Sequence, residues 1–298
     1  MKPTPQTATG NKAQSELILN PDGSLYHLGI IPSDLANDII VVGDPERVPQ
    51  ISARFAKVEV KKHSREFCVH TGWHNQSRIT VLSTGIGVDN IDIVVNELTA
   101  CVNIDLSTRV PLTDKRSLNI IRLGTSGTMR EEIEVGSIVT SEFALGIDGV
   151  PWFYDPQFEE MESSFLDAFA QQVDWPENLA SPYVAMASAI LTERLAKDTV
   201  MGVTFTANGF YGPQFRELNL PVKYSSLWDQ IQSFNFQQRV FTNFEMECAG
   251  LYALGSLMGH EVITLCTILA NRKTGEFHSS PQMAVDGLID LALSRLTP

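Results

Sequence analysis

Apolar and polar positions along the chain alternate in blocks that predict strands and helices in turn. Residues 39–42 form an unbroken apolar run that ends at Gly43, which is typical of a buried strand followed by a turn. Residues 89–102 instead have an apolar face at helical spacing: Ile91, Val94, Val95, Leu98 and Val102. Further strands are predicted at 58–62, 67–73, 78–84, 119–124, 135–143, 184–189, 201–207 and 262–270, and further helices at 46–55, 163–173, 191–198, 245–258 and 281–296. This alternation indicates an α/β fold with three layers, α/β/α, and a mixed, largely parallel central sheet.

The chain is expected to form one domain. Residues 1–20 are rich in Thr, Gln, Lys and Pro and predict a flexible N-terminal arm, which a turn at 20–23 follows. Residues 21–298 contain no linker and no internal repeat, so we expect a single domain there. Within it, residues 105–117 are polar and turn-rich and predict a surface insertion.

Composition argues against several classes of function. The formal net charge of −13 disfavours binding to nucleic acid or to an anionic membrane, because both partners need a basic face. The cysteines (Cys68, Cys101, Cys248 and Cys266) lack the spacing of a zinc or redox site and are expected to be buried thiols. The N-terminal residues lack the apolar core of a signal peptide, and no apolar run approaches the roughly 20 residues of a membrane span. We therefore expect a cytoplasmic protein without a metal site.

Two glycine-containing turns that open helices are candidate ligand loops. The stretch GDPERV at 43–48 follows a buried strand, and Arg47 can close over an anion held at the helix N-terminus. The stretch STGIG at 83–87 lacks the third glycine and the acidic residue of a dinucleotide fingerprint. The alternatives are a plain connecting turn at 43–48 and close backbone packing at 83–87.

An arginine inside an apolar strand is a stronger signal. Arg122 lies in IIRLG, where an unpaired guanidinium would be costly. We expect the strand to end in a Gly-Thr-Ser-Gly turn at 124–127, at the sheet edge where α/β proteins bind ligands. A bound anion would account for both features, and a structural Arg–carboxylate pair is the alternative.

Two later stretches carry groups suited to a sugar and a base. Glu245, Met246 and Glu247 are expected in the first turn of a helix, where a carboxylate can bind paired hydroxyls or merely complement the helix dipole. In FYGPQFR at 210–216, the amide and guanidinium match the polar edge of a pyrimidine and Phe210 can stack on its face. Ordinary surface chemistry is the alternative for the second stretch.

Together these motifs resemble the uridine phosphorylases of the nucleoside phosphorylase superfamily, from about Tyr26 onward. The matching stretches occur in the family's order: YHLGI at 26–30, GDPERV at 43–48, SREF at 64–67, STGIG at 83–87, IRLGTSG at 121–127, FYGPQFR at 210–216, FEMECA at 244–249 and ANR at 270–272. The resemblance implies the single-domain nucleoside phosphorylase fold.

The resemblance also implies a role for each matching residue. The implied phosphate site consists of Gly43, Arg47, Arg122 and Thr125, with Arg65 of the partner subunit. The implied ribose contacts are Met246 and Glu247, with His27 of the partner subunit. The implied base site consists of Phe210, Gln214 and Arg216, with Ser126, Gly127, Glu245 and Arg272 near the same base. Of these, Arg122, Glu247, Arg216 and Gln214 would be catalytic, in a homodimer or a trimer of dimers with sites shared across the dimer contact.

The sequence departs from the family pattern at 88–90, where Val-Asp-Asn replaces the Gly-Pro-Ser usual in bacterial uridine phosphorylases. In some of those enzymes this segment helps to hold a monovalent cation between subunits. Glu66, Ile86 and Asn90 are the candidates here, but no cation is predicted.

The expected reaction is cleavage of uridine, or a related pyrimidine nucleoside, by inorganic phosphate to give uracil and ribose 1-phosphate. Phosphate is then a co-substrate, and no organic cofactor is needed. The alternatives are a purine nucleoside phosphorylase, a nucleosidase of the same superfamily, and a non-catalytic nucleoside-binding protein. Asn271 stands where similar purine enzymes usually carry an acid.

Overall fold

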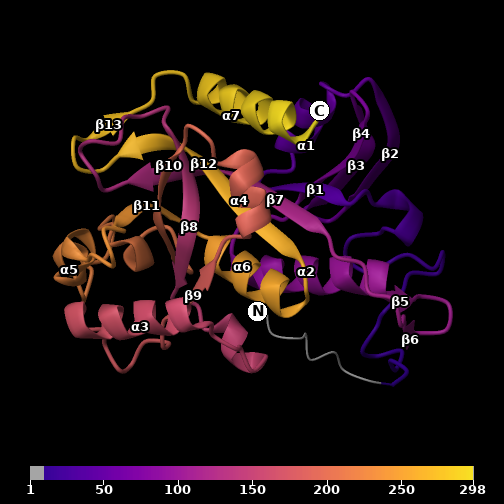
Figure 1. Cartoon of the computed structure of the whole chain (residues 1–298), viewed down its shortest axis with the longest axis horizontal. Helices are drawn as coiled ribbons and strands as arrows, with labels where there is room; N and C mark the ends of the chain where they lie inside the picture. Colours follow the sequence, from indigo (N-terminus) through magenta and orange to yellow (C-terminus); the bar gives the residue numbers. More distant parts are fainter. Residues whose placement is uncertain (1–9, 298) are drawn as a thin grey trace.

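The computed structural model describes residues 10–297 of the chain, and one large mixed sheet of 11 strands forms its centre (Figure 1). Its strands are β1 (Asp38–Val42), β2 (Lys57–Ser64), β3 (Phe67–His74), β4 (Ser77–Ser83), β7 (Asn119–Thr128), β8 (Ile138–Gly146), β9 (Tyr183–Met186), β10 (Val200–Thr206), β11 (Phe241–Glu245), β12 (Glu261–Asn271) and β13 (Glu276–Phe277). The order is β13-β12-β8-β10-β11-β7-β1-β4-β3-β2, with β9 beside β8. This arrangement confirms the mixed α/β fold.

The sheet is open at one end and curled at the other. Strand β12 pairs with β8 and also, in parallel, with β7, so β7, β11, β10, β8 and β12 close on one another. Strand β1 pairs with β7 only as far as Val41 and Arg122. Beyond Arg122 the two strands diverge, and the space between their carboxyl ends becomes the candidate site.

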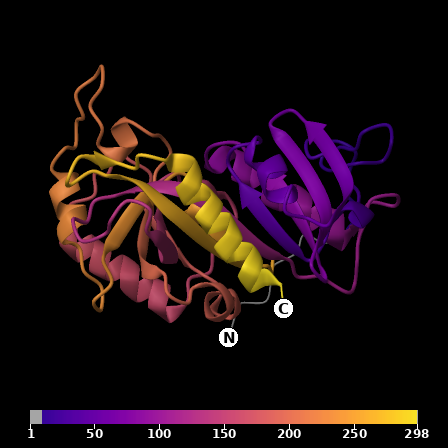
Figure 2. The same cartoon turned by 90° about the horizontal axis from the view of Figure 1, so that it is seen from above.

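Helices cover both faces of the sheet, as a three-layer fold requires. They are α1 (Arg47–Ser52), α2 (Val88–Asn103), α3 (Glu160–Gln172), α4 (Ala189–Leu195), α5 (Leu227–Ser233), α6 (Cys248–Leu257) and α7 (Pro281–Leu296). The apolar face of α2 packs with α6 in one core cluster, whereas α1, α4 and α7 share another (Figure 1). Figure 2 shows α7 running across the molecule between the N-terminal strands and the later ones. None of the described helices is long and apolar enough to cross a membrane.

Two predicted elements differ from the structure at the site. The strand expected to end at Gly124 continues to Thr128, so the expected turn at 124–127 is wrong and these residues belong to β7. The helix expected from Glu245 begins at Cys248, because residues 241–245 form β11, which pairs with β10 and β7. Pairing with distant strands set the end of β7 and the start of α6. Helix α5 was also not predicted from the sequence.

The N-terminal segment lies against the polar insertion. Residues 104–111 form the hairpin β5 (Ile104–Asp105) and β6 (Val110–Pro111). Its Arg109 accepts a backbone hydrogen bond from Lys12 and donates a side-chain bond to the Leu17 carbonyl. Leu17 is buried in the core cluster that contains α2. The flexible arm predicted for 1–20 therefore stays a prediction for residues 1–9, which lie outside the described residues.

The cysteines are free thiols among the described residues. Cys101, Cys248 and Cys266 are buried, as expected, whereas Cys68 is half-buried. Burial raises the pKa of Cys266 to about 11 and so keeps it protonated at neutral pH.

Candidate active site

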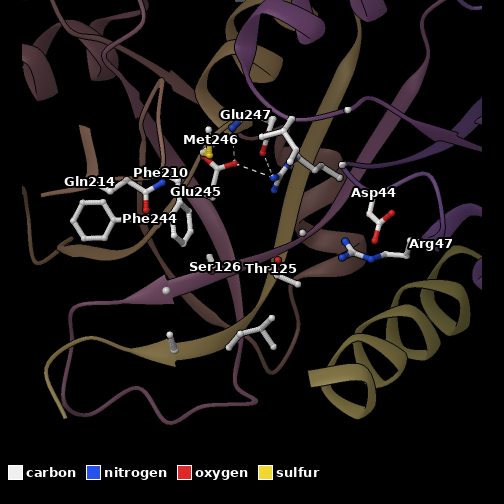
Figure 3. A pocket seen from close by; sticks show the side chains of 18 of the residues that line it. Asp44, Arg47, Thr125, Ser126, Phe210, Gln214, Phe244, Glu245, Met246 and Glu247 are labelled. Carbon is white, nitrogen blue, oxygen red and sulfur yellow. Dashed lines mark hydrogen bonds and ion pairs between the residues drawn. The ribbon is translucent and has the colours of Figure 1, made fainter. Parts of the chain in front are cut away.

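A cavity of about 750 Å³ opens at the carboxyl ends of β1, β4 and β7. Most of the residues predicted for phosphate, sugar and base line it: Gly43, Arg47, Arg122, Thr125, Ser126, Gly127, Phe210, Gln214, Arg216, Glu245, Met246 and Glu247. Figure 3 shows Arg47 at one end, Gln214 with Phe210 at the other, and Glu245, Met246 and Glu247 along the wall between them. The structure thus brings together residues from four separate motifs.

Glycines let the loops at the Arg47 end approach one another. A Cβ on Gly43 would lie 3.4 Å from the carbonyl oxygen of Gly85, so the two strand-end loops pass close together. Gly85 and Gly87 have φ values of 71° and 96°, which side chains rarely tolerate. The two glycines of STGIG are therefore needed for backbone conformation.

Arg122 is the charged centre of the cavity. Its side chain is 6% exposed, and its Nη2 forms ion pairs with Glu247 and, at 3.2 Å, with Glu245. Burial alone would lower the pKa of Arg122, but the two carboxylates outweigh it and raise that pKa well above the usual value. The guanidinium lies over Gly124, where a Cβ would come within 2.2 Å of Nη1. The Arg–carboxylate pair, kept as an alternative from the sequence, is present within the candidate site.

Glu245 is held by protein groups on every side. Its Oε2 accepts hydrogen bonds from the backbone N–H groups of Glu247 (2.8 Å) and Cys248 (2.9 Å) as well as the ion pair from Arg122. Its side chain is only 1% exposed. Burial raises the pKa of Glu245, against the opposing effect of Arg122. These contacts favour a role in fixing the start of α6 and the position of Arg122.

Glu247 links the two halves of the cavity. Its Oε1 accepts a hydrogen bond from the Gly87 N–H at 2.7 Å, and its Oε2 pairs with Arg122. A carboxylate has about four lone-pair directions, so each oxygen can still accept a hydroxyl. Glu247 is therefore oriented towards a ligand by groups from two other loops.

Arg47 lies at the end of the cavity opposite Gln214. Its Nη1 donates to the Leu123 carbonyl at 3.2 Å. Burial lowers the pKa of Arg47, and the nearby positive charge of Arg122 lowers it further against the opposing effect of Asp44. Two guanidinium groups that repel each other in a half-buried cavity form a favourable environment for a small anion.

At the opposite end, one short turn supplies the polar groups. Arg216 donates from Nη1 to the Phe210 carbonyl (2.8 Å) and to Gln214 Oε1. Its guanidinium stacks over the Phe210 ring, 4.0 Å from the centroid. The Gln214 oxygen Oε1 already accepts from Arg216, whereas the Gln214 amide nitrogen is the group that can donate a hydrogen bond to a ligand.

Arg272 and Asn271 lie outside the residues that line the cavity. Arg272, predicted near the base, donates to the carbonyls of Gln214 (2.6 Å) and Phe215 (3.2 Å). Asn271 uses its amide on the backbone of Arg130 and Ile133 and of the turn that follows it. Position 271 therefore holds a loop and supplies no acid to the cavity.

His27 and Arg65 do not line this cavity in their own chain. Arg65 is exposed and lies over the Tyr26 ring, 5.2 Å from its centroid. His27 is half-buried, with Nδ1 2.6 Å from Glu97 Oε1, and Glu97 also accepts from the backbone N–H groups of His27 and Leu28. Both side chains lie in one surface cluster. Their assignment to a partner's site stays a prediction.

The cation candidates gather at the cavity rim. Glu66, Ile86 and Asn90 all line it, and Asn90 Nδ2 would come within 2.3 Å of a Cβ on Gly85. Within residues 10–297, no group of three or more His, Cys, Asp or Glu side chains is arranged to hold a metal ion.

The sequence interpretation missed several lining residues: Asp44, Phe244, Leu269, Ala270 and Phe277. Phe244 is part of the FEMECA stretch, so its neighbourhood was identified but its ring was not assigned. Phe277 follows a turn that joins β12 to β13, and no local pattern marks it.

Comparisons with known proteins agree with this geometry. A model of the phosphorylase superfamily matches residues 38–294. The chain is 31% identical over 259 residues to a uridine phosphorylase of Thermococcus kodakarensis, covering 86% of this chain and 80% of that relative. It is 23% identical over 273 residues to a DeoD-type purine nucleoside phosphorylase of Buchnera aphidicola, covering 91% and 98%. A solved Trypanosoma brucei nucleoside phosphorylase, described as showing uridine phosphorylase activity, superposes with a TM-score of 0.85 at 27% identity, covering 94% and 99%.

The chain therefore belongs to the phosphorylase superfamily. Within that superfamily it is similar both to relatives named for uridine and to relatives named for purine nucleosides.

Proposed function

We propose that this protein cleaves uridine with inorganic phosphate, giving uracil and ribose 1-phosphate. The observation that carries the proposal is the layout of one cavity, with Arg47 at one end and Gln214, which accepts a hydrogen bond from Arg216, at the other. Arg122 lines the same cavity, close enough for its charge to act on Arg47. Glu247 lies between the two ends. This order of cationic, hydroxyl-accepting and amide groups suits the order phosphate, ribose and base in the reacting complex.

The reaction needs positioning and electrostatics more than acid–base chemistry. The bond from the ribose anomeric carbon to the base nitrogen breaks, its electron pair stays on the base, and a phosphate oxygen bonds to that carbon. The sugar is cationic and the base anionic in the transition state. Phosphate charge stabilises the sugar, and hydrogen bonds from Gln214 and Arg216 stabilise the uracil anion as its charge develops. Uracil then takes a proton from solvent.

Two observations favour uridine over a purine nucleoside. The Gln214–Arg216 pair offers amide and guanidinium groups that complement the carbonyl–NH–carbonyl edge of uracil. Position 271 offers no acid to protonate a purine ring nitrogen, since Asn271 is bound to backbone groups. The cavity volume does not distinguish uridine from a purine nucleoside, because about 750 Å³ would hold either.

A turnover assay with and without phosphate tests the proposal. Wild-type protein should release uracil from uridine only when phosphate is present. Arg122→Ala should abolish phosphorolysis while the fold persists, as judged by circular dichroism. Phosphate-independent release of base would identify a nucleosidase, and a protein that binds uridine without turnover would be a binding protein.

A further inference from the structure

A stack of aromatic rings and one guanidinium lies behind the base end of the cavity. The Trp228 ring of α5 is stacked on Phe244, with centroids 5.5 Å apart and planes 9° apart. The guanidinium carbon of Arg272 lies 4.2 Å from the centroid of Trp228. The Phe215 ring meets Trp228 edge-on at 6.2 Å. Of these residues, only Phe244 lines the cavity.

The Arg272 guanidinium donates two hydrogen bonds to the turn that carries the proposed base-binding groups. Its Nη1 and Nη2 donate to the consecutive carbonyls of Gln214 and Phe215, at 2.6 and 3.2 Å. Phe215 has φ 59°, a left-handed conformation that costs a residue with a side chain free energy. The two hydrogen bonds therefore hold a strained turn in the shape that brings Gln214 and Arg216 to the same cavity wall.

The positive charge of Arg216 repels that of Arg272, so the Arg272 side chain needs a further contact to stay in place. A Cβ on Gly127 would lie 3.6 Å from Arg216 Nη2 and 3.9 Å from Arg272 Cδ, so both arginines converge on Gly127. Burial and the charge of Arg216 lower the pKa of Arg272 to about 10, which still leaves it protonated at neutral pH. Two like charges repel, and the Trp228 face offsets that repulsion by a cation–π contact.

We propose that Trp228 is a positioning residue for base recognition, because its ring holds Arg272 against the carbonyls of the Gln214–Phe215–Arg216 turn. Trp228 does not line the cavity and acts through Arg272. The proposal rests on the proposed function, in which that turn binds uracil.

Substitutions of Trp228 and a matched tryptophan test this role. Trp228→Leu removes the aromatic face, and Trp228→Phe keeps one. Trp175→Leu is the control, since Trp175 is also half-buried and packs on the same aromatic core through Phe169 without contacting Arg272. The measurements are KM for uridine, KM for phosphate, kcat and the thermal midpoint of each protein.

We expect Trp228→Leu to raise the uridine KM about tenfold, the scale of a lost cation–π contact at a partly buried site. The phosphate KM should stay unchanged, because Arg47 and Arg122 are held by other groups. Trp228→Phe should recover most of the loss, and Trp175→Leu should resemble wild type. An unchanged uridine KM in Trp228→Leu, or an equal rise in Trp175→Leu, would overturn the proposal. An equal rise in the phosphate KM would do the same.

A second variant serves if Trp228→Leu does not fold. Arg272→Lys keeps the charge but loses the planar fork, so it should show the same selective rise in uridine KM. A wild-type-like uridine KM in that variant would contradict the proposal that Arg272 holds the Gln214–Phe215–Arg216 turn. Failure of the proposed function is distinguishable, because wild-type protein would then not cleave uridine at all. The same comparison would be made with the nucleoside that it does cleave.

Discussion

Arg122 and Glu247 are 125 residues apart in the chain and form a buried ion pair between two side chains that line the cavity. The pair joins strand β7 to Glu247, the residue that precedes α6. Because Glu247 also accepts from the Gly87 N–H, a single carboxylate fixes the relative positions of three segments. Changes at Glu247 should therefore affect phosphate and nucleoside together.

Replacing Glu247 with Gln tests this coupling. The amide keeps an acceptor for Gly87 but loses the charge that faces Arg122 and the ribose hydroxyls. Charge-assisted hydrogen bonds contribute about 1.5–3 kcal/mol each, so kcat/KM should fall roughly tenfold to hundredfold. Steady-state kinetics with each substrate varied would measure the loss. Unchanged kinetics would assign Glu247 to the support of Arg122 and α6 alone.

Gly124→Ala should weaken phosphate binding although it replaces no charged residue. The new Cβ would lie 2.2 Å from Arg122 Nη1 and 2.8 Å from Cys266 Sγ, so the guanidinium must move. We expect the phosphate KM to rise at least about tenfold, since one displaced charge-assisted hydrogen bond costs about 1.5–3 kcal/mol.

Gly287→Ala is the matched control for Gly124→Ala. A Cβ at Gly287 meets nothing within 4 Å, and the residue is exposed inside α7. This variant should keep the wild-type phosphate KM and gain about 0.5–1 kcal/mol in the free energy of unfolding. If both variants left the phosphate KM unchanged, Arg122 would not be a phosphate ligand.

Gly124 shows why part of the site could be predicted from the sequence and part could not. The apolar run at 39–42 and Arg122 inside IIRLG are local signals, because a buried strand and a buried charge are visible in a few consecutive residues. The need for glycine at 124 depends on where the Arg122 side chain turns, which no local pattern contains. The same holds for residues 241–245, whose strand conformation depends on pairing with β10 and β7.

The family resemblance favoured one of two interpretations that local chemistry had left open. For Gln214 and Arg216 these were a pyrimidine edge and ordinary surface chemistry, and the structure brings the pair to the cavity wall. The resemblance also identified His27 and Arg65, but a single chain leaves them outside the cavity, so their role depends on assembly. Trp228 was missed altogether, since α5 has no strong helical pattern and its stack forms only in three dimensions.

Mixing two inactive variants tests whether the site is shared between subunits. His27→Ala and Glu247→Ala would each inactivate one half of a composite site. In a two-fold dimer, a mixed pair contains one site with both substitutions and one that is wholly native. Co-refolded mixtures should regain part of the wild-type activity. Verified mixed dimers without activity would indicate that each site is made within one chain.

His260 should make the fold sensitive to acid. The buried ring accepts from the Leu118 N–H at Nδ1 (3.2 Å) and contacts Thr99 Oγ1 through Nε2 (2.9 Å), so the neutral form fits. Burial lowers the pKa of His260 from 6.5 to about 4. Between these values the unfolded chain binds a proton that the folded chain does not. Stability is therefore full above pH 6.5 and falls towards pH 4, by on the order of 3 kcal/mol from this group.

Denaturant unfolding at pH 7 and pH 5 would measure the part of that loss that falls between these two conditions. His260→Asn removes the titrating group and should show a smaller difference between the two conditions. His63→Asn, at an exposed position, should behave as wild type does. Equal pH dependence in the wild type and His260→Asn would assign the acid sensitivity to other groups.

The choice of base gives the most direct test of the proposed reaction. At saturating phosphate, we expect efficient cleavage of uridine and little cleavage of inosine or adenosine. A purine leaves poorly unless an acid protonates its ring, and Asn271 cannot supply one. Uracil spreads its developing charge over its carbonyls, where Gln214 and Arg216 can donate hydrogen bonds. A base that leaves those buried donors unpaired should be rejected strongly, by a factor on the order of 10⁴ in kcat/KM.

A double comparison separates the two causes of that preference. Gln214→Ala should lower uridine cleavage and leave the phosphate KM near wild type, because Gln214 is at the end of the cavity opposite Arg47. Asn271→Asp should not create inosine cleavage, since position 271 lies outside the residues that line the cavity and the amide it replaces faces the carbonyls of Arg130 and Ile133. Its thermal midpoint should fall, because a carboxylate cannot donate to those carbonyls. Efficient inosine cleavage by the wild type, with uridine inert, would overturn the pyrimidine assignment, and a gain of inosine cleavage in Asn271→Asp would show that position 271 reaches the base.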